Sequence, residues 1–159
     1  MTSKERVLER ERQRGRAAAL EVQEKAPELD GTALNAVDDR IPDFRAACAN
    51  QNMLERKPGF VCRSSAGRVV RLIQPYDSTT YTQEPEDLAA QWGFAWSQDP
   101  AKAKPFISLV TSPYKTGDCC TYEGHIWRSG QDNNTWAPGT INIKWEDLGP
   151  IEEEVNTNE

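Results

Sequence analysis

Several residue types and patterns are scarce in this chain of 159 residues. No apolar run approaches the roughly 20 residues that a membrane-spanning helix needs. The N-terminal stretch MTSKERVLERERQRGR lacks the apolar segment and cleavage site of a secretory signal, so we expect synthesis in the cytoplasm and no membrane contact. Positive charge is also in deficit, with a formal net charge of -6. Nucleic-acid binding relies on clustered Lys and Arg, so nucleic acid is excluded as the main partner.

Metal-ligating and catalytic patterns are missing too. Cys119 and Cys120 are neighbours rather than a C-x-x-C pair, and His125 is the only imidazole. We expect no metal and no cofactor, and we predict reduced cysteines that fill strand positions as small apolar side chains. The chain has no recognisable Ser/His/Asp or Cys/His motif and no phosphate-binding glycine loop. We therefore expect that it is not an enzyme.

What is present changes in character near residue 50. Residues 1–50 contain few aromatics and many helix formers, and we expect a helical arm or anchor there. Residues 4–25 carry several Glu/Arg pairs at i,i+4 spacing but no core-facing apolar stripe in their first half, and Pro27 ends this predicted helix. Such an arm could dock onto a partner, or it could be a solvated and partly disordered extension.

A second, shorter helix is predicted within LDGTALNAVDDRIPDF, residues 29–44. A turn at Asp30 and Gly31 precedes an N-cap at Thr32, and the helix stops before Pro42. The apolar residues of this segment fall on one face: Leu34, Val37 and Ile41.

The stretch KTGDCCTYEGHIWRS, residues 115–129, predicts a β-hairpin with a two-residue loop at Glu123 and Gly124. A loop of this length fixes the strand register. Counting outward, the predicted pairs are Tyr122 with His125, Thr121 with Ile126, Cys120 with Trp127, and Cys119 with Arg128. Opposed residues share a face, so Cys120, Tyr122, His125 and Trp127 should line one side of the hairpin.

Residues 57–92 repeat this design approximately. Both copies run turn, hairpin, polar loop with a proline, and closing tryptophan, and we expect a further strand between them at 106–110. The matched pairs are Lys57 with Lys115, Gly59 with Gly117, Cys62 with Cys120, Gly67 with Gly124 after one inserted residue, Arg71 with Arg128, and Trp92 with Trp145.

These patterns predict an α+β protein in which an N-terminal helical segment is followed by two small antiparallel β modules. The expected parts are a helical arm at 1–50, a degenerate β module at 51–98, a second β domain at 99–150 and an acidic tail at 151–159.

The second copy carries a series of residues that points to a known family: Tyr114, Gly117, Asp118, Tyr122, Gly124, Trp127, Pro138 and Trp145. It resembles the small chitin-binding carbohydrate-binding module of bacterial chitinases and phage structural proteins, whose pattern is Y-x-x-G-D-x-V-x-Y-x-G-x-x-Y, then a polar loop with Pro, then Trp. The resemblance covers about residues 106–149 and, more weakly, 57–96. The order of helical segment and two copies also resembles small proteins encoded among phage and prophage tail genes.

The chain departs from the module pattern at several positions. Cys120 stands where the pattern has Val, and Lys144 replaces the first residue of a Trp-Trp pair, which leaves less flat surface for a sugar ring. The first copy departs further, with Phe60, Ser64 and Val70 in place of Asp, Tyr and Trp. We expect that copy to be structural.

Sugar rings present apolar C–H faces that pack on exposed aromatic rings, while their hydroxyl groups need flanking donors and acceptors. Trp136, in the amide-rich loop QDNNTWAPG beside Asn133 and Asn134, is the first candidate for an exposed platform. The resemblance adds Trp127, Tyr122 and Trp145 as carbohydrate-binding candidates. A domain this small could instead use these three large rings as its core.

The resemblance implies a phage tail-associated virion protein, assembled in the host cytoplasm, whose module attaches to host-surface glycans. The expected partners are a cell-surface polysaccharide, other virion proteins that contact the N-terminal helices, and further copies of the chain in a homo-oligomer. Two alternatives remain open: a purely structural assembly subunit without sugar binding, and an accessory domain that acts beside a separate cell-wall hydrolase.

Overall fold

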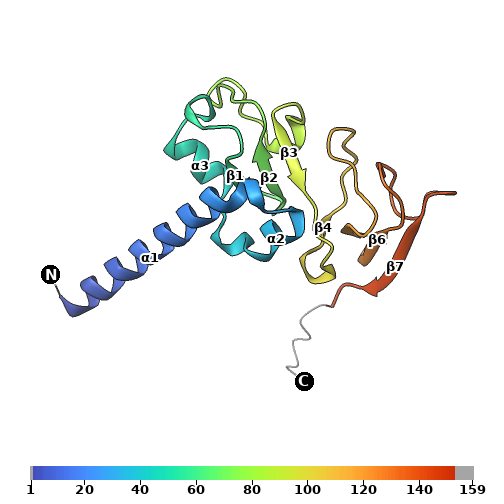
Figure 1. The fold of residues 1–159 in the computed structure, drawn as a ribbon, viewed down its shortest axis with the longest axis horizontal. Helices are drawn as coiled ribbons and strands as arrows, with labels where there is room; N and C mark the ends of the chain where they lie inside the picture. The colour runs from blue at the N-terminus through green and yellow to red at the C-terminus, as the bar shows by residue number, and fades with distance from the viewer. Residues whose placement is uncertain (1, 153–159) are drawn as a thin grey trace. The chain divides into compact units, whose positions relative to one another are not determined.

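The computed structural model describes residues 2–152 and confirms the α+β architecture, with helices first and two small sheets after them (Figure 1). The chain forms two compact units, Met1–Ala95 and Trp96–Glu159, hereafter the N-terminal and C-terminal units. From residue 153 onward the expected acidic tail lies outside the described residues. The helices are α1 (Ser3–Lys25), α2 (Gly31–Ala36) and α3 (Phe44–Asn50). The strands are β1 (Val61–Arg63), β2 (Val69–Leu72), β3 (Trp92–Ala95), β4 (Lys104–Pro105), β5 (Cys119–Tyr122), β6 (His125–Ser129) and β7 (Trp145–Pro150).

Helix α1 confirms the prediction for residues 4–25. A capping box starts it: the amide of Glu5 donates to Thr2 Oγ1 at 3.1 Å, and the amide of Thr2 donates to Glu5 Oε2 at 2.7 Å. The helix ends at Lys25, and Pro27 lies in the short 3-10 turn that follows. Nearly all of the first half of α1 is exposed, as the missing apolar stripe predicted.

Helix α2 begins two residues earlier than predicted. Its N-cap is Asp30, whose Oδ1 accepts from the amide of Ala33 at 2.8 Å, so the predicted cap at Thr32 is wrong. Asp is a stronger N-cap residue than Thr, and Asp30 precedes Thr32 in the chain, so the helix begins after Asp30. Leu34 and Ile41 are buried together as predicted.

Helix α3 was not predicted. It is short and alanine-rich, and Asp43 caps it by accepting from the amide of Ala46 at 3.0 Å. Phe44 and Ala47 are its buried residues, and they pack against the first sheet.

The first sheet, in the order β1-β2-β3, is antiparallel and buried on both faces. One face packs against α3 and the segment after it through Cys62, Val70, Leu72 and Trp92, with Phe44, Ala47, Met53 and Tyr76 opposite. The other face packs against α1 and α2 through Val61 and Val69, with Val22, Ala26, Leu34 and Ile41 opposite. The sheet is therefore the middle layer of the N-terminal unit.

Two polar side chains fasten the helices to this sheet. The amide group of Gln23 donates to Val61 O at 2.7 Å and accepts from Val61 N at 3.0 Å. The guanidinium of Arg71 donates to Ala26 O at 2.9 Å and to Leu29 O at 3.1 Å, and so satisfies carbonyls just beyond the end of α1. The C-terminal end of α1 is thus part of the same packed body as β1 and β2. The unit boundary accordingly falls at residue 95, whereas the sequence suggested boundaries at 50 and 98.

The second sheet, in the order β4-β5-β6-β7, contains the predicted hairpin. Its four strand pairs have the register that the two-residue loop predicted, and Glu123 and Gly124 have positive φ values of 48° and 79°. The strand expected at 106–110 is wrong: a two-residue strand, β4, lies just before it and pairs in parallel with β5.

The structure confirms the internal repeat. Gly59 and Gly117 share a φ of 98°. The amide of Gly59 donates to the carbonyl of Leu72 at 2.7 Å, and the amide of Gly117 donates to the carbonyl of Ser129 at 2.8 Å. Each acceptor is the last residue of the second hairpin strand in its copy. The closing tryptophans occupy matching sites, because Trp92 pairs with Leu72 and Trp145 with Ser129. The amide of Ser64 donates to Arg68 O at 2.8 Å, and this pair matches Tyr122 with His125, so three residues form the first loop and two the second, as the alignment predicted.

Candidate functional site

A cluster of aromatic rings forms the centre of the C-terminal unit. Tyr114 is fully buried, stacks on Trp96 at 4.4 Å and on Phe106 at 5.6 Å between ring centroids, and meets Trp145 in a perpendicular contact at 5.5 Å. Tyr122 joins this cluster through a perpendicular contact with Phe106 at 5.8 Å. Two of the predicted binding residues, Tyr122 and Trp145, therefore give part of their ring surface to the core.

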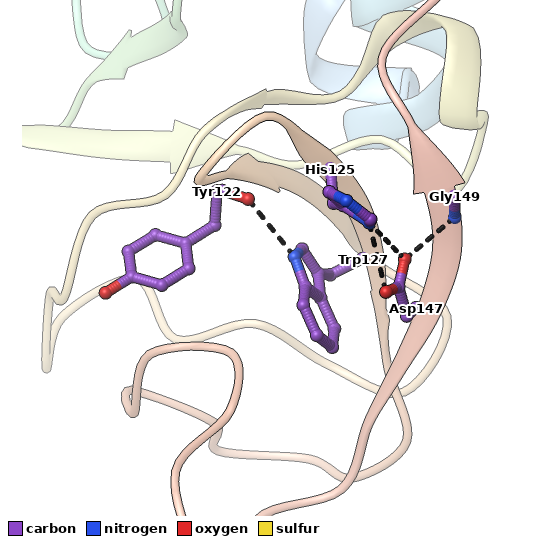
Figure 2. Close-up of polar contacts among 5 residues, drawn as sticks. All are labelled: Tyr122, His125, Trp127, Asp147 and Gly149. Atoms are coloured by element: carbon purple, nitrogen blue, oxygen red, sulfur yellow. Dashed lines mark hydrogen bonds and ion pairs between the residues drawn. The ribbon is translucent and has the colours of Figure 1, made fainter.

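Trp127 lies on the same face of the sheet but further along it. It is half-buried and pairs across the strands with Cys120 on one side and Asp147 on the other. Its indole Nε1 donates to the carbonyl of Tyr122 at 3.3 Å, and Figure 2 shows the ring between Tyr122 and the side chains of His125 and Asp147. The indole nitrogen is satisfied within the protein, so the ring is fixed in place.

His125 and Asp147 form an exposed pair beside this ring. The Nδ1 atom of His125 lies 2.9 Å and 3.0 Å from the two carboxylate oxygens of Asp147, and the two side chains are 42% and 43% exposed. The amide of Gly149 donates to Asp147 Oδ1 at 2.8 Å (Figure 2). The hydrogen bond from His125, followed by that from Gly149, lowers the pKa of Asp147 below its usual value. The centroid of the His125 ring is 6.4 Å from that of Trp127.

A β-bulge in β7 creates this arrangement. Trp127 pairs with Asp147, but the preceding residue of β6, Ile126, pairs with Gly149, so Leu148 is the extra residue. Gly149 has a φ of 107°, which suits glycine. The predicted hairpin register places His125 on this face, but Asp147 was not among the predicted residues. Asp147 could have been found from the alternation of side chains along the last strand, which puts it on the same face as Trp145.

The loop that carries Trp136 is fixed at several points. Trp136 is 47% exposed, and its carbonyl accepts from Trp145 Nε1 at 2.9 Å. Asn134 is fully buried: its amide group donates to Ser129 Oγ at 3.1 Å and accepts from Trp136 N at 3.2 Å. Asn133 is exposed with a φ of 52°.

The structure thus separates the six predicted residues by environment. Trp127, Trp136 and Asn133 offer side-chain surface to solvent, whereas Tyr122 and Trp145 are partly used in the core and Asn134 holds the loop. We name the neighbouring residues Trp127, His125 and Asp147 the open aromatic face; Trp136 and Asn133 lie in the loop that follows β6.

The cysteines behave as the sequence predicted. Cys119 and Cys120 are buried on β5, and burial raises the pKa of the Cys120 thiol to about 12. A thiol with so high a pKa has little thiolate at neutral pH and is a poor nucleophile. These residues therefore contribute packing rather than chemistry.

The first copy has no counterpart of the open aromatic face. Ser64 and Val70, at the positions of Tyr122 and Trp127, are buried at 3% and 0% exposure. Helices cover both faces of that sheet, so its equivalent positions have no access to a ligand.

Among residues 2–152 no helix is both long and apolar enough to cross a bilayer. Comparison of the chain with protein-family models, with curated proteins and with solved structures finds no match in any of the three.

Proposed function

We propose that the C-terminal unit is a glycan-binding module, and that the chain is a non-catalytic, tail-associated phage virion protein that attaches to host-surface polysaccharide. The observation that carries this proposal is the position of Trp127: a half-buried ring with a fixed indole, flanked by the exposed His125–Asp147 pair. The resemblance to chitin-binding modules and to phage tail proteins supplies the biological setting.

The chemistry of the face suits a sugar ring. A pyranose stacks its C–H face on an indole, and its hydroxyl groups then require polar partners at the margin of the ring. Nδ1 of His125 lies against the Asp147 carboxylate, so Nε2 is the ring nitrogen left to face a sugar hydroxyl group. The Asp147 oxygens offer further acceptor capacity. The indole of Trp127 and the backbone amide of Trp136 are each held by a hydrogen bond, so the loss of conformational entropy on binding is reduced.

Retention on insoluble polysaccharide tests the proposal. The full chain is incubated with chitin, with peptidoglycan and with intact host cell walls, and the bound fraction is measured against protein concentration. Trp127→Ala and Trp136→Ala should each weaken binding at least about tenfold, because each removes a stacking surface. Val110→Ala is the matched control, since Val110 is an apolar side chain of the same unit that is 87% exposed.

Melting curves accompany each variant, so lost folding is not mistaken for lost binding. A wild-type chain that stays in solution with every glycan contradicts the glycan-binding function. The virion assignment has a separate test: antibody against the chain should label purified phage particles, and a protein that never co-purifies with virions contradicts it.

A second candidate function is that of a structural assembly subunit. The observation in its favour is α1, whose first half leaves Leu8 at 44% and Val7 at 52% exposure. In this function the N-terminal helices contact other virion proteins or further copies of the chain, and the second sheet retains a sugar-binding fold without activity. Failure of glycan retention together with labelled virions would favour it.

A further inference from the structure

An apolar groove lies in the N-terminal unit between the C-terminal half of α1 and α3. Its volume is about 430 Å³, and α1 contributes Arg16, Ala19 and Leu20 to one wall. Ala46 and Phe60 belong to its apolar lining on the other side. Leu20 is 63% exposed there. An open apolar groove of this size on a small unit is characteristic of a binding surface.

The first half of α1 carries side chains that match this groove. This half extends beyond α2, α3 and the first sheet (Figure 1). Glu5 is three residues from Leu8 and four from Glu9, and Arg12 is four from Leu8 and three from Glu9, so the four residues share one face of the helix. Leu8 is the apolar residue of this face, and acidic side chains lie on either side of it.

Arg16 and Ala19 continue this face into the groove wall, and Leu20 lies at its margin, about 120° around the helix from Leu8. One face of α1 therefore has two carboxylates near its N-terminus, one of them 3.9 Å from Arg12, and, further on, Arg16 and the apolar Ala19. Across the groove, the guanidinium of Arg56 lies 4.2 Å over the ring of Phe60 and donates to Ala47 O at 3.0 Å. Its buried Nε has no hydrogen-bond partner among residues 2–152. The groove thus has cationic margins, and the opposite end of α1 has an apolar residue between carboxylates.

A helix with this pattern is complementary to an antiparallel copy of itself. In such a pair, the Glu5–Leu8–Glu9 face of one chain meets the Arg16 and Leu20 region of the other, and the reverse contact is identical by symmetry. A parallel pair would place like charges together. Leu8 cannot enter the groove of its own chain, because α1 is one continuous helix and twelve residues separate Leu8 from Leu20, about 18 Å along the axis.

We infer that the chain forms a two-fold dimer in which the α1 helices pack antiparallel and Leu8 of each copy occupies the groove of the other. The occupant of the groove is therefore a second copy of this chain. The dimer depends on the N-terminal unit alone, so it is independent of glycan binding. Sedimentation measures dimerisation, and retention on polysaccharide measures glycan binding.

Sedimentation velocity of the full chain over a wide concentration range tests the dimer. Wild type should show a concentration-dependent monomer–dimer equilibrium, and Leu8→Ala should raise the dissociation constant at least about tenfold, since two leucines leave the interface. Val7→Ala is the matched control: Val7 is as exposed as Leu8 but points about 100° away around the helix. Circular dichroism checks that both variants keep their helical content.

Charge reversal gives a second, independent test. Glu9→Arg and Arg16→Glu should each weaken the dimer, and the double variant should restore it, because every chain then carries the swapped pair. A chain that is monomeric at all concentrations overturns the inference and leaves the groove to another protein. Dimerisation that ignores Leu8→Ala, or that falls equally with Val7→Ala, also overturns it, because the contact then lies elsewhere or is unspecific. Failure of the double variant to recover removes the antiparallel arrangement.

Discussion

Replacing Trp92 by alanine should strongly destabilise the N-terminal unit and leave the C-terminal unit unchanged. Trp92 is fully buried, meets Phe44 and Tyr76 in perpendicular ring contacts at 5.8 Å and 6.2 Å, and donates from Nε1 to Tyr76 Oη at 3.0 Å. Truncation of a buried tryptophan costs about 3–5 kcal/mol, and the lost hydrogen bond adds about 1 kcal/mol. Domains of this size have a total stability of about 5–15 kcal/mol, so the variant retains little.

Two probes follow the units separately. The α-helices of the described chain all lie in the N-terminal unit, so far-ultraviolet circular dichroism reports mainly on that unit. His125 is the only histidine of the sequence and lies in the C-terminal unit, so its imidazole proton signals in NMR report on the other. In Trp92→Ala the helical melting temperature should fall by at least about 16 °C, which is 4 kcal/mol at about 4 °C per kcal/mol. The His125 signals should stay at their native positions.

Two further variants bracket this result. Tyr76→Phe keeps the ring but leaves the Trp92 indole N–H unsatisfied, so it should cost about 1–3 kcal/mol. Tyr81→Ala removes an aromatic ring that is 54% exposed in the same unit and should change stability by less than about 0.5 kcal/mol. The reasoning is refuted if Trp92→Ala costs no more than Tyr81→Ala, or if the His125 signals shift together with the helical signal.

Three other outcomes are expected. Gly124→Ala should destabilise the C-terminal unit by about 1–2 kcal/mol. The cost is backbone strain alone, because the added Cβ meets nothing within 4 Å. Gly124→Asn should cost less, and equal melting temperatures for the two variants would contradict this explanation. Hydrogen bonds from Thr79 and other neighbours hold the pKa of Asp77 well below its usual 3.8. The stabilising effect of the Asp77 carboxylate is therefore complete above about pH 4 and is lost as the pH falls further. The difference in melting temperature between wild type and Asp77→Asn should be constant from about pH 7 to 5 and shrink below about pH 4. Thiol labelling of the folded chain should modify the half-buried Cys48 before the buried Cys120, and simultaneous labelling would show that the second sheet opens readily.

The hairpin of the C-terminal unit was predictable in detail because its information is local. A two-residue loop with glycine at its second position permits one register, and the pairs that follow are fixed by counting. The repeat was predictable for a similar reason: Gly59 and Gly117 need the same left-handed backbone, and the spacing to the next strand is kept.

The environment of the aromatic residues was not predictable to the same degree. Tyr122, Trp127 and Trp145 are all large aromatic residues in strands with polar neighbours in the sequence. Only the packing around Tyr114 decides which of the three rings faces the core. Asn134 reads as a polar loop residue, yet its two hydrogen-bonding groups are used to shape the loop, and this follows from the backbone pairing with Tyr114. Tertiary contacts of this kind leave no periodic trace in the sequence.

The His125–Asp147 pair escaped prediction because a bulge sets it. A bulge adds one residue to one strand, and glycine at 149 is the sequence feature that accompanies it, whereas strand alternation marks only the face on which Asp147 lies. The position of the helices on the first sheet escaped prediction for another reason. Their anchors, Gln23 and Arg71, reach backbone groups far away in the chain, so composition alone suggested a separate arm.

The amide of Gln23 has a consequence for the behaviour of the chain at high concentration. By both donating to and accepting from Val61, it occupies backbone groups on the outer side of β1 that another molecule's strand would otherwise use. The remaining outer strands are protected in other ways: Asn35 donates to the carbonyl of Ala95 at the end of β3, β4 has two residues and includes Pro105, and β7 carries a bulge and ends in Pro150. Both sheets are therefore poor templates for edge-to-edge aggregation, so concentrated solutions of the folded chain should not nucleate intermolecular strand pairing at these edges.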